Sequence, residues 1–157
     1  MSVKASHTEK HWVASLLVSP TVMVATAFFL RFAFIVLFRL YRFSVYPSNF
    51  WFGFEVGGVA RSLAAGQGFS SPCGFSSGAT ALIPPVYPTL LSLIFRMFGV
   101  FSDASGFVIL TLNAVVSALT CLPILWIGRR TLGETVSIVA AWFWVFWPMG
   151  FWEVRRV

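Results

Sequence analysis

The sequence predicts an all-α, polytopic membrane protein with about four transmembrane helices. Of its 157 residues, 58% are hydrophobic and only 10% are charged, whereas a soluble domain carries about 25% charged residues. Three windows contain no Asp, Glu, Lys or Arg: Val13–Leu30, Ala104–Gly128 and Thr135–Trp152. Each window reaches the roughly 18 residues that mark a candidate transmembrane helix. A chain of this composition lacks the polar side chains that would cover a surface in water.

The apolar windows fix the expected order of the elements. We expect the spans at about residues 12–38, 85–100, 107–128 and 135–152, with a long first external loop at about 39–84. The first apolar run is longer than the roughly 7–15 residues of a signal-peptide core, so it predicts an uncleaved anchor. Basic residues divide evenly between the two ends of these spans, so charge does not set the orientation.

Three residues inside the expected spans have individual consequences. Arg31 lies near one end of the first span, where its long stem allows the charged head to reach the membrane surface. Pro123 and Pro148 are expected to kink or end their helices, because proline has no amide hydrogen to donate.

The long loop is expected to carry one amphipathic helix, at residues 54–65. At 100° per residue, one side collects Val56, Val59, Ala60, Leu63 and Ala64, and the other side collects Glu55, Gly58, Arg61 and Ser62. We expect this helix to lie in the membrane interface with its apolar side toward lipid. Gly66 and Gly68 are expected to end it. The following SSPCGFSSGAT has no periodic pattern and predicts irregular structure, and Pro88 is suited to the start of the second span.

The net charge of +6 is interpreted as membrane anchoring rather than as nucleic-acid binding. The arginines occur as pairs at the ends of the spans, where they meet anionic lipid headgroups, and they form no basic groove. The chain contains no phosphate-binding loop, no GxSxG and no HExxH motif, and its two cysteines form no CxxC pair. These absences exclude the common soluble nucleotide, serine-hydrolase and zinc-protease chemistries.

Glu55 is the strongest candidate for a catalytic residue, because it is the sole acid between Glu9 and Asp103. A carboxylate at a membrane boundary is able to take a proton from an acceptor hydroxyl or to bind a divalent cation. The structural interpretation is a solvated interfacial carboxylate paired with an arginine, or a first-turn residue stabilised by the helix dipole. The sequence identifies no cofactor, and it leaves open whether the protein uses a divalent cation.

Four further residues are candidates for substrate binding. Arg61 lies on the polar side of the same expected helix and is able to bind a phosphate bidentately, or it serves as an interfacial anchor. Pro84, Pro85 and Tyr87 shape a pocket before the second span, or they simply end the loop.

Several sequence segments, taken in their order along the chain, resemble a known family of proteins. VARSLAAGQGF is followed by SSP, by SGATALIPPVYPTLL, by a span ending in FRMFG, by LNAVVSALTCLPILWIGRRTLG and by AAWFWVFWP. This series, over about residues 52–148, resembles the amino-terminal part of the large GT-C membrane glycosyltransferases. It is most similar to the bacterial family 39 enzymes related to protein mannosyltransferases and to the aminoarabinose transferase.

The resemblance implies a multi-pass enzyme of the bacterial inner membrane. Such an enzyme transfers a sugar, with inversion, from a polyprenyl-phosphate donor to an acceptor (a glycan, lipid or protein) at the outer face. By position Glu55 matches the key acid of the family, and Pro84 and Pro85 match its proline pair before the second span. Two positions depart from the family pattern: Phe54 stands where many members have a second acid, and Ile83 where some have a lysine.

Members of this family have several hundred residues and many more spans. The resemblance therefore implies that residues 1–157 are the amino-terminal portion of one integral membrane glycosyltransferase domain. The alternative interpretation is a non-catalytic four-span membrane protein, acting as an assembly partner or as a small transport subunit. A membrane acyltransferase or phosphotransferase is disfavoured, because both histidines lie within the first 11 residues.

Overall fold

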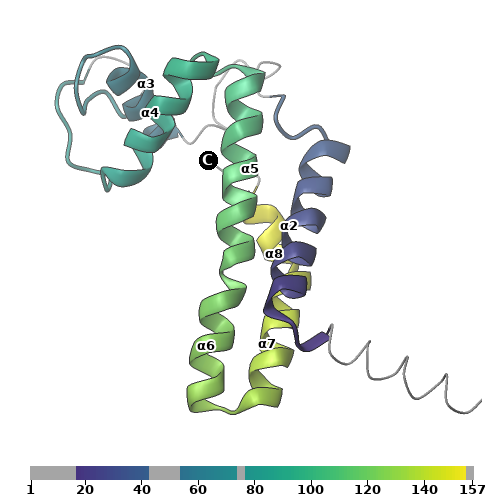
Figure 1. The fold of residues 1–157 in the computed structure, drawn as a ribbon. Coiled ribbons are helices and arrows are strands. Elements are labelled where there is room, and N and C mark those ends of the chain that lie inside the picture. The colour runs from purple at the N-terminus through teal and green to yellow at the C-terminus, as the bar shows by residue number, and fades with distance from the viewer. Residues whose placement is uncertain (1–16, 43–53, 74–76, 155–157) are drawn as a thin grey trace, which may run out of the picture. The chain divides into compact units, whose positions relative to one another are not determined.

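The computed structural model describes residues 17–42, 54–73 and 77–154, and these form helices and connecting loops with a single isolated β-bridge. Figure 1 shows the helices, which are α2 (Pro20–Leu37), α3 (Phe54–Ala64), α4 (Val86–Phe98), α5 (Asp103–Leu119), α6 (Cys121–Thr131), α7 (Glu134–Phe146) and α8 (Pro148–Val154). The predicted all-α class is confirmed for the described residues. The expected start of the first span at 12–16, and loop residues 43–53 and 74–76, lie outside them.

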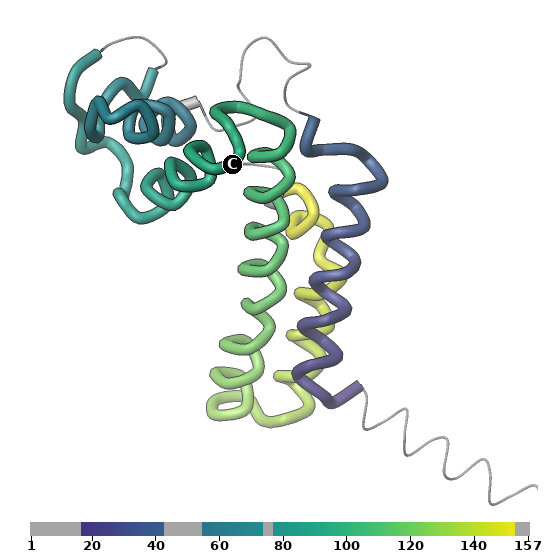
Figure 2. The backbone as a smooth tube through the Cα atoms, turned by 45° about the horizontal axis from the view of Figure 1, so that its top comes forward, coloured from purple at the N-terminus to yellow at the C-terminus, as the bar shows by residue number. Residues whose placement is uncertain are grey.

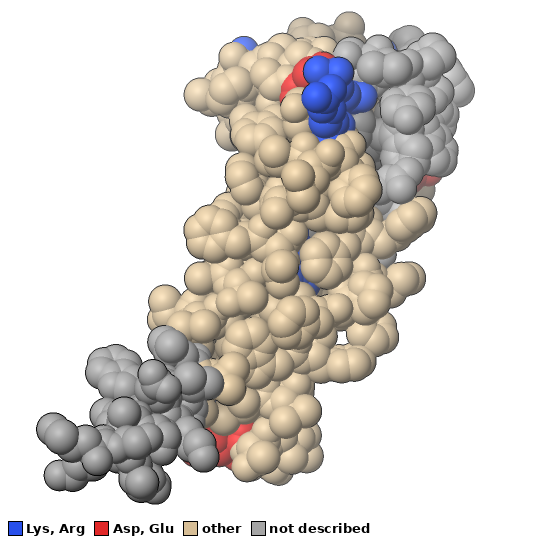
Figure 3. Space-filling view, turned by 90° about the vertical axis from the view of Figure 1, so that its right-hand side faces the viewer, with Lys and Arg blue, Asp and Glu red and all other residues tan. Residues whose placement is uncertain are grey.

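Among the described residues, two helices are long and apolar enough to cross a membrane. They are Pro20–Leu37 with 18 residues and the nearly continuous stretch Asp103–Thr131 with 29 residues. Only 22% of the first apolar window and 33% of the second are buried, so both helices expose mainly apolar side chains. Figure 3 shows a face on which charged atoms gather in a few small groups. Lipid is the solvent that favours such surfaces.

The expected spans at 85–100 and 135–152 correspond to shorter apolar helices. The helices α4 and α7 have 13 residues each, and 13 residues rise about 20 Å. A hydrocarbon core is about 30 Å thick. The spans at 12–38 and 107–128 are thus matched by helices of sufficient length, and the other two stay predictions.

The chain divides into two compact units, which we call the bundle unit (Met1–Phe32 with Ala114–Phe151) and the loop unit (Ala33–Asn113 with Trp152–Val157). The core of the bundle unit consists of buried side chains from α2, α5, α6 and α7: Met23, Ala27, Ala118, Cys121, Leu125, Ala141 and Val145. In Figure 2 a short turn joins α6 to α7, and the two helices run back along each other.

A glycine allows α6 and α7 to pack closely. A Cβ atom on Gly128 would lie 2.7 Å from the Cβ of Ser137 and 3.1 Å from its Cα, so any side chain at position 128 forces the helices apart. The buried face of α6 is Cys121, Leu125 and Gly128, and that of α7 is Ser137, Ala141 and Val145. The small residues among them, Gly128, Ser137 and Ala141, permit the close approach seen at interfaces between membrane helices.

Pro123 and Pro148 interrupt the helices of the bundle unit, as expected. Pro123 has no N–H for the carbonyl of Leu119, and the chain changes from α5 to α6 between Leu119 and Cys121. Helix α7 ends at Phe146, Trp147 is extended with ψ 118°, and Pro148 opens α8. A proline suits the first position of a helix, where no amide donor is required.

In the loop unit, helix α3 confirms the helix expected at 54–65, but the expected division of its faces is wrong in part. Gly58 and Ser62, assigned to the polar side, are buried together with Val59 and Ala60. A Cβ atom on Gly58 would lie 2.5 Å from the carbonyl oxygen of Pro72. This face therefore packs against protein rather than lipid, because its small residues let the loop backbone come close.

Candidate functional site

A polar pocket lies at the C-terminal end of α3, within the loop unit. Its volume is about 750 Å³, which is within the range of small-molecule sites. It is lined by the end of α3 and by two segments of the loop that follows: Arg61, Ala65, Gln67, Gly68, Phe69, Ser70, Ser71, Gly78 and Ala79.

The pocket begins where α3 stops. Gly66 has a φ of +76°, a left-handed conformation that glycine adopts without steric cost. Its N–H donates to the carbonyl of Leu63 at 3.1 Å, and the N–H of Gln67 donates to that of Ser62 at 2.9 Å. The predicted stop at Gly66 is confirmed, and it turns the chain so that Gln67 and Phe69 line the pocket.

A short antiparallel contact holds the two loop segments together. Ser70 forms an isolated bridge with Ala79, the N–H of Ser71 donates to the carbonyl of Gly78 at 3.1 Å, and the N–H of Thr80 donates to that of Phe69 at 3.1 Å. Sequence reasoning expected irregular structure here and missed this contact, since the segment has no alternation of apolar and polar residues.

Two contacts attach the loop and α4 to α3. The carbonyl of Pro72 lies over Gly58, as described above. From α4, Arg96 Nη2 donates to the carbonyl of Leu63 at 2.8 Å, which adds a second donor to the last-turn carbonyl that also accepts the N–H of Gly66. These contacts hold Arg61 and the loop in one arrangement.

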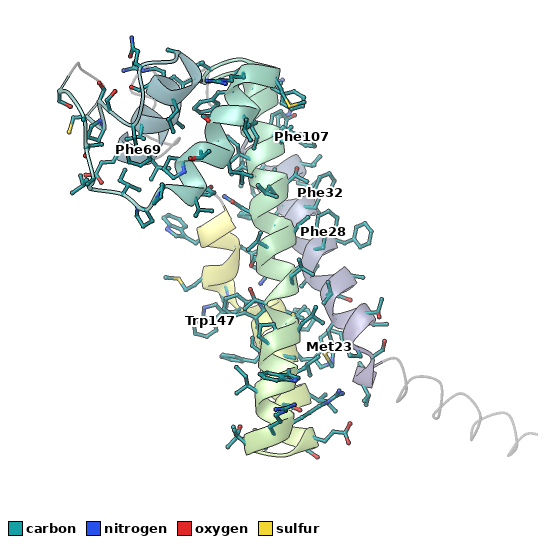
Figure 4. All side chains as sticks on the ribbon, turned by 60° about the vertical axis from the view of Figure 1, so that its left-hand side comes forward. Met23, Phe28, Phe32, Phe69, Phe107 and Trp147 are labelled. Carbon is teal, nitrogen blue, oxygen red and sulfur yellow. The ribbon has the colours of Figure 1, made fainter. Side chains whose placement is uncertain are left out.

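The pocket combines a cation, hydrogen-bonding groups and an aromatic ring. Arg61 is half-buried, and Phe69, labelled in Figure 4, belongs to the loop beside α3. Ser70 Oγ donates to the carbonyl of Gln67 at 3.3 Å. Ser71 has a φ of +57°, a left-handed conformation that costs about 1–2 kcal/mol for a residue with a side chain. Strain of this kind is concentrated at functional sites.

Of the expected site residues, Arg61 lines this pocket and the other four lie elsewhere in the loop unit. Glu55 is exposed in the first turn of α3, about 9 Å along the helix axis from Arg61. Pro84 and Pro85 are exposed, and Pro85 caps the start of α4. Tyr87 is half-buried, and its hydroxyl donates to Asn113 Oδ1 at 3.1 Å. Within the described ranges, no three His, Cys, Asp or Glu residues form a group that could hold a metal ion.

The bundle unit contains a second polar centre, and here the expectation for Arg31 is wrong. Arg31 does not extend to a surface, because its side chain is fully buried. Its Nη1 donates to the carbonyls of Ala27 at 3.1 Å and Val145 at 3.3 Å, and its Nη2 donates to the carbonyl of Trp144 at 3.0 Å. No ion pair of Arg31 with an acid occurs in the part of the chain that the structure describes.

The break at Pro148 explains why these carbonyls attract Arg31. The carbonyl of Trp144 would normally accept a hydrogen bond from the N–H four residues later, and Pro148 has none. It accepts instead the N–H of Trp147 at 3.3 Å, which leaves room for a second donor. The last-turn carbonyls also carry the negative end of the helix dipole, which favours a cation. The guanidinium carbon lies 5.9 Å from the ring centre of Trp144 and 5.5 Å from that of Phe151. The sequence signal was a lone arginine in one apolar helix together with a proline break in another.

Gly150 and Trp144 complete this centre. A Cβ atom on Gly150 would lie 2.7 Å from Arg31 Nη2, so the glycine makes room for the guanidinium. Trp144 Nε1 donates to the carbonyl of Ser117 at 2.9 Å, close to the change from α5 to α6. Trp144 thus links the two proline breaks of the bundle unit.

Comparisons with known protein families, with curated proteins and with solved structures found no match for this chain.

Proposed function

We propose that this chain belongs to a multi-pass enzyme of the bacterial inner membrane that transfers a sugar from a polyprenyl-phosphate donor to an acceptor at the outer face. The observation that carries the proposal is the layout of α3. An exposed carboxylate, Glu55, opens the helix, and the other end of the same helix supplies Arg61 to a polar pocket. This helix lies in the loop that follows the first apolar helix, as in the family that the sequence resembles.

The proposal gives Glu55 the role of general base. The acceptor hydroxyl attacks the anomeric carbon of the sugar, its proton passes to the Glu55 carboxylate, and the bond from that carbon to the polyprenyl phosphate breaks. Attack from the side opposite the phosphate inverts the anomeric configuration. Arg61 is assigned to the binding of substrate, together with Pro84, Pro85 and Tyr87 at the start of α4. A carboxylate exposed at the start of a helix is accessible to an acceptor hydroxyl without rearrangement of the fold.

The kind of sugar donor that the protein accepts tests the proposed class of glycosyl transfer. The protein, as its gene encodes it, is reconstituted in vesicles and supplied with a panel of labelled hexoses, each linked either to polyprenyl phosphate or to a nucleoside diphosphate. We expect transfer from a polyprenyl-linked sugar alone, with inversion of the anomeric configuration. Transfer from the nucleotide sugars, or retention of configuration, would overturn the proposal.

A second candidate is the non-catalytic membrane protein that assists assembly or transport. The buried guanidinium of Arg31 favours it, because a charged side chain inside an apolar helix bundle often marks a transport or assembly role. The broken pair α7 and α8 is also typical of transport proteins, whose interrupted helices bind ions or substrates. This candidate predicts that cells tolerate any residue at position 55 and lose function when Arg31 is changed.

A further inference from the structure

The pocket at the end of α3 offers three chemically different groups to one ligand. Arg61 brings a guanidinium, whose planar pair of N–H donors matches the oxygens of a phosphate. Gln67, Ser70 and Ser71 bring a side-chain amide and two hydroxyls. Phe69 brings an aromatic face, which is negative at its centre and attracts the slightly positive C–H groups of an apolar surface.

These groups together favour one class of ligand over simpler ones. A free inorganic anion has no apolar face that could contact the ring of Phe69. A neutral sugar has no negative charge that could pair with the guanidinium of Arg61. A lipid chain offers no hydrogen-bond partner to the amide of Gln67 or to the hydroxyls of Ser70 and Ser71. A ligand that uses all three groups carries an anionic group, several hydroxyls and one apolar face.

We propose that this pocket binds a sugar phosphate, with Arg61 on the phosphate, Phe69 against the sugar ring and Gln67 near the sugar hydroxyls. The inference rests on the proposed function for the role of the sugar, and on the pocket alone for its binding. Glu55 lies at the opposite end of α3 and does not line the pocket. Binding and transfer are therefore separable by mutation.

The pocket needs little rearrangement to accept such a ligand. The bridge between Ser70 and Ala79 fixes the loop, and the hydrogen bond from Arg96 to the carbonyl of Leu63 fixes the end of α3. A preformed site loses less conformational entropy on binding than a loop that orders only with its ligand.

Ligand-observed NMR on the whole protein in nanodiscs of the zwitterionic lipid phosphatidylcholine tests the proposal, with glucose 1-phosphate, glucose and inorganic phosphate as probes. We expect wild-type protein to bind glucose 1-phosphate at least about tenfold more tightly than either glucose or phosphate, since charged hydrogen bonds and ring contact both contribute. Equal binding of phosphate and glucose 1-phosphate would overturn the assignment of a sugar, and no binding of glucose 1-phosphate would overturn the site.

Three variants locate the binding. Arg61→Gln is expected to weaken the binding of glucose 1-phosphate at least about tenfold, and Phe69→Leu about threefold to tenfold. Arg130→Gln is the control, because Arg130 lies over the ring of Trp126 in α6, outside the pocket. If Arg61→Gln and Arg130→Gln bind alike, the site is not this pocket. Because the comparison of probes uses wild-type protein, it stands even if a variant fails to fold.

A competition experiment identifies the source of the sugar phosphate. If polyprenyl phosphate added to the nanodiscs does not displace glucose 1-phosphate, the pocket holds a separate sugar phosphate. If it does, the pocket holds the headgroup of the donor, and the role of Glu55 as general base is then overturned while the binding site stands, because Glu55 does not line the pocket. Glu55→Gln separates this inference from the proposed function. It is expected to bind glucose 1-phosphate as wild type does, whether or not sugar transfer is lost.

Discussion

Arg31 Nη2 donates a hydrogen bond of 3.0 Å to the carbonyl of Trp144, which also accepts the N–H of Trp147 at 3.3 Å but has no donor at Pro148. A guanidinium on α2 thereby adds a donor where the regular i to i+4 hydrogen bonding of α7 ends at Pro148. It also satisfies the carbonyl of Val145 at 3.3 Å. A buried arginine and a proline break, each costly alone in an apolar bundle, compensate for each other.

The planar pair of N–H donors of Arg31 is expected to contribute more to the stability of the bundle unit than the charge of Arg31 does. Arg31→Lys keeps the charge but cannot reach two neighbouring carbonyls with a planar pair of donors. We expect it to lower the free energy of unfolding by about 1–3 kcal/mol, since buried carbonyls lose their partners. Unfolding in detergent, followed by circular dichroism, measures this. Arg130→Lys, at an exposed position, is the control, and equal stability of the two variants would refute the role given to Arg31.

Pro148 and Arg31 are expected to be energetically coupled. Pro148→Ala restores the N–H that makes the regular i to i+4 hydrogen bond to the carbonyl of Trp144, which accepts only the N–H of Trp147 from the backbone in wild type. The bundle then depends less on the hydrogen bond from Arg31. In a double-mutant cycle, Arg31→Met should cost about 1 kcal/mol less in the Pro148→Ala background than in wild type. Additive effects of the two substitutions would show that the break does not depend on the arginine.

The close crossing of α6 and α7 predicts a clash and its relief. Gly128→Ala places a Cβ 2.7 Å from that of Ser137, and we expect it to destabilise the bundle unit by about 1–3 kcal/mol. Ser137→Gly removes the clashing atom, so the double variant should recover part of the loss. Thermal unfolding of the single and double variants provides the measurement, and a double variant no more stable than Gly128→Ala would contradict the packing.

Gly58 is expected to control the shape of the pocket without touching a ligand. Gly58→Ala drives a Cβ against the carbonyl of Pro72, at 2.5 Å in the present arrangement, so the loop must move away from α3. We expect glucose 1-phosphate to bind about tenfold more weakly, equivalent to about 1.4 kcal/mol. Glu55→Ala, an exposed change on the same helix, serves as the control and should leave this binding unaltered. Unchanged binding by Gly58→Ala would show that the loop contact does not shape the site.

The parts of the fold that local sequence determines were predictable. Apolar, charge-free windows predicted α2 and the α5–α6 stretch, and the lack of an amide hydrogen at Pro123 and Pro148 predicted both breaks. Gly66 predicted the end of α3. Each of these features depends on residues within a few positions of one another.

Features that depend on distant residues were not predictable. The burial of Arg31 follows from the approach of the end of α7, more than 100 positions away along the chain. Gly58 and Ser62 were assigned to a polar face because polarity alone does not show where a backbone carbonyl will pack. The pocket around Arg61 requires the bridge between Ser70 and Ala79, for which the sequence carries no alternating pattern.

The rate of sugar transfer by the Glu55→Gln variant tests the central claim most directly. Wild type, Glu55→Gln and Glu134→Gln are compared in vesicles with the polyprenyl-linked sugar that wild type accepts. Glu134 is the matched control, because it is also an exposed carboxylate in the first turn of a helix. We predict that Glu55→Gln transfers sugar at least about a hundredfold more slowly, as loss of a general base requires, while Glu134→Gln remains near wild type. Transfer by Glu55→Gln at the wild-type rate would contradict the account.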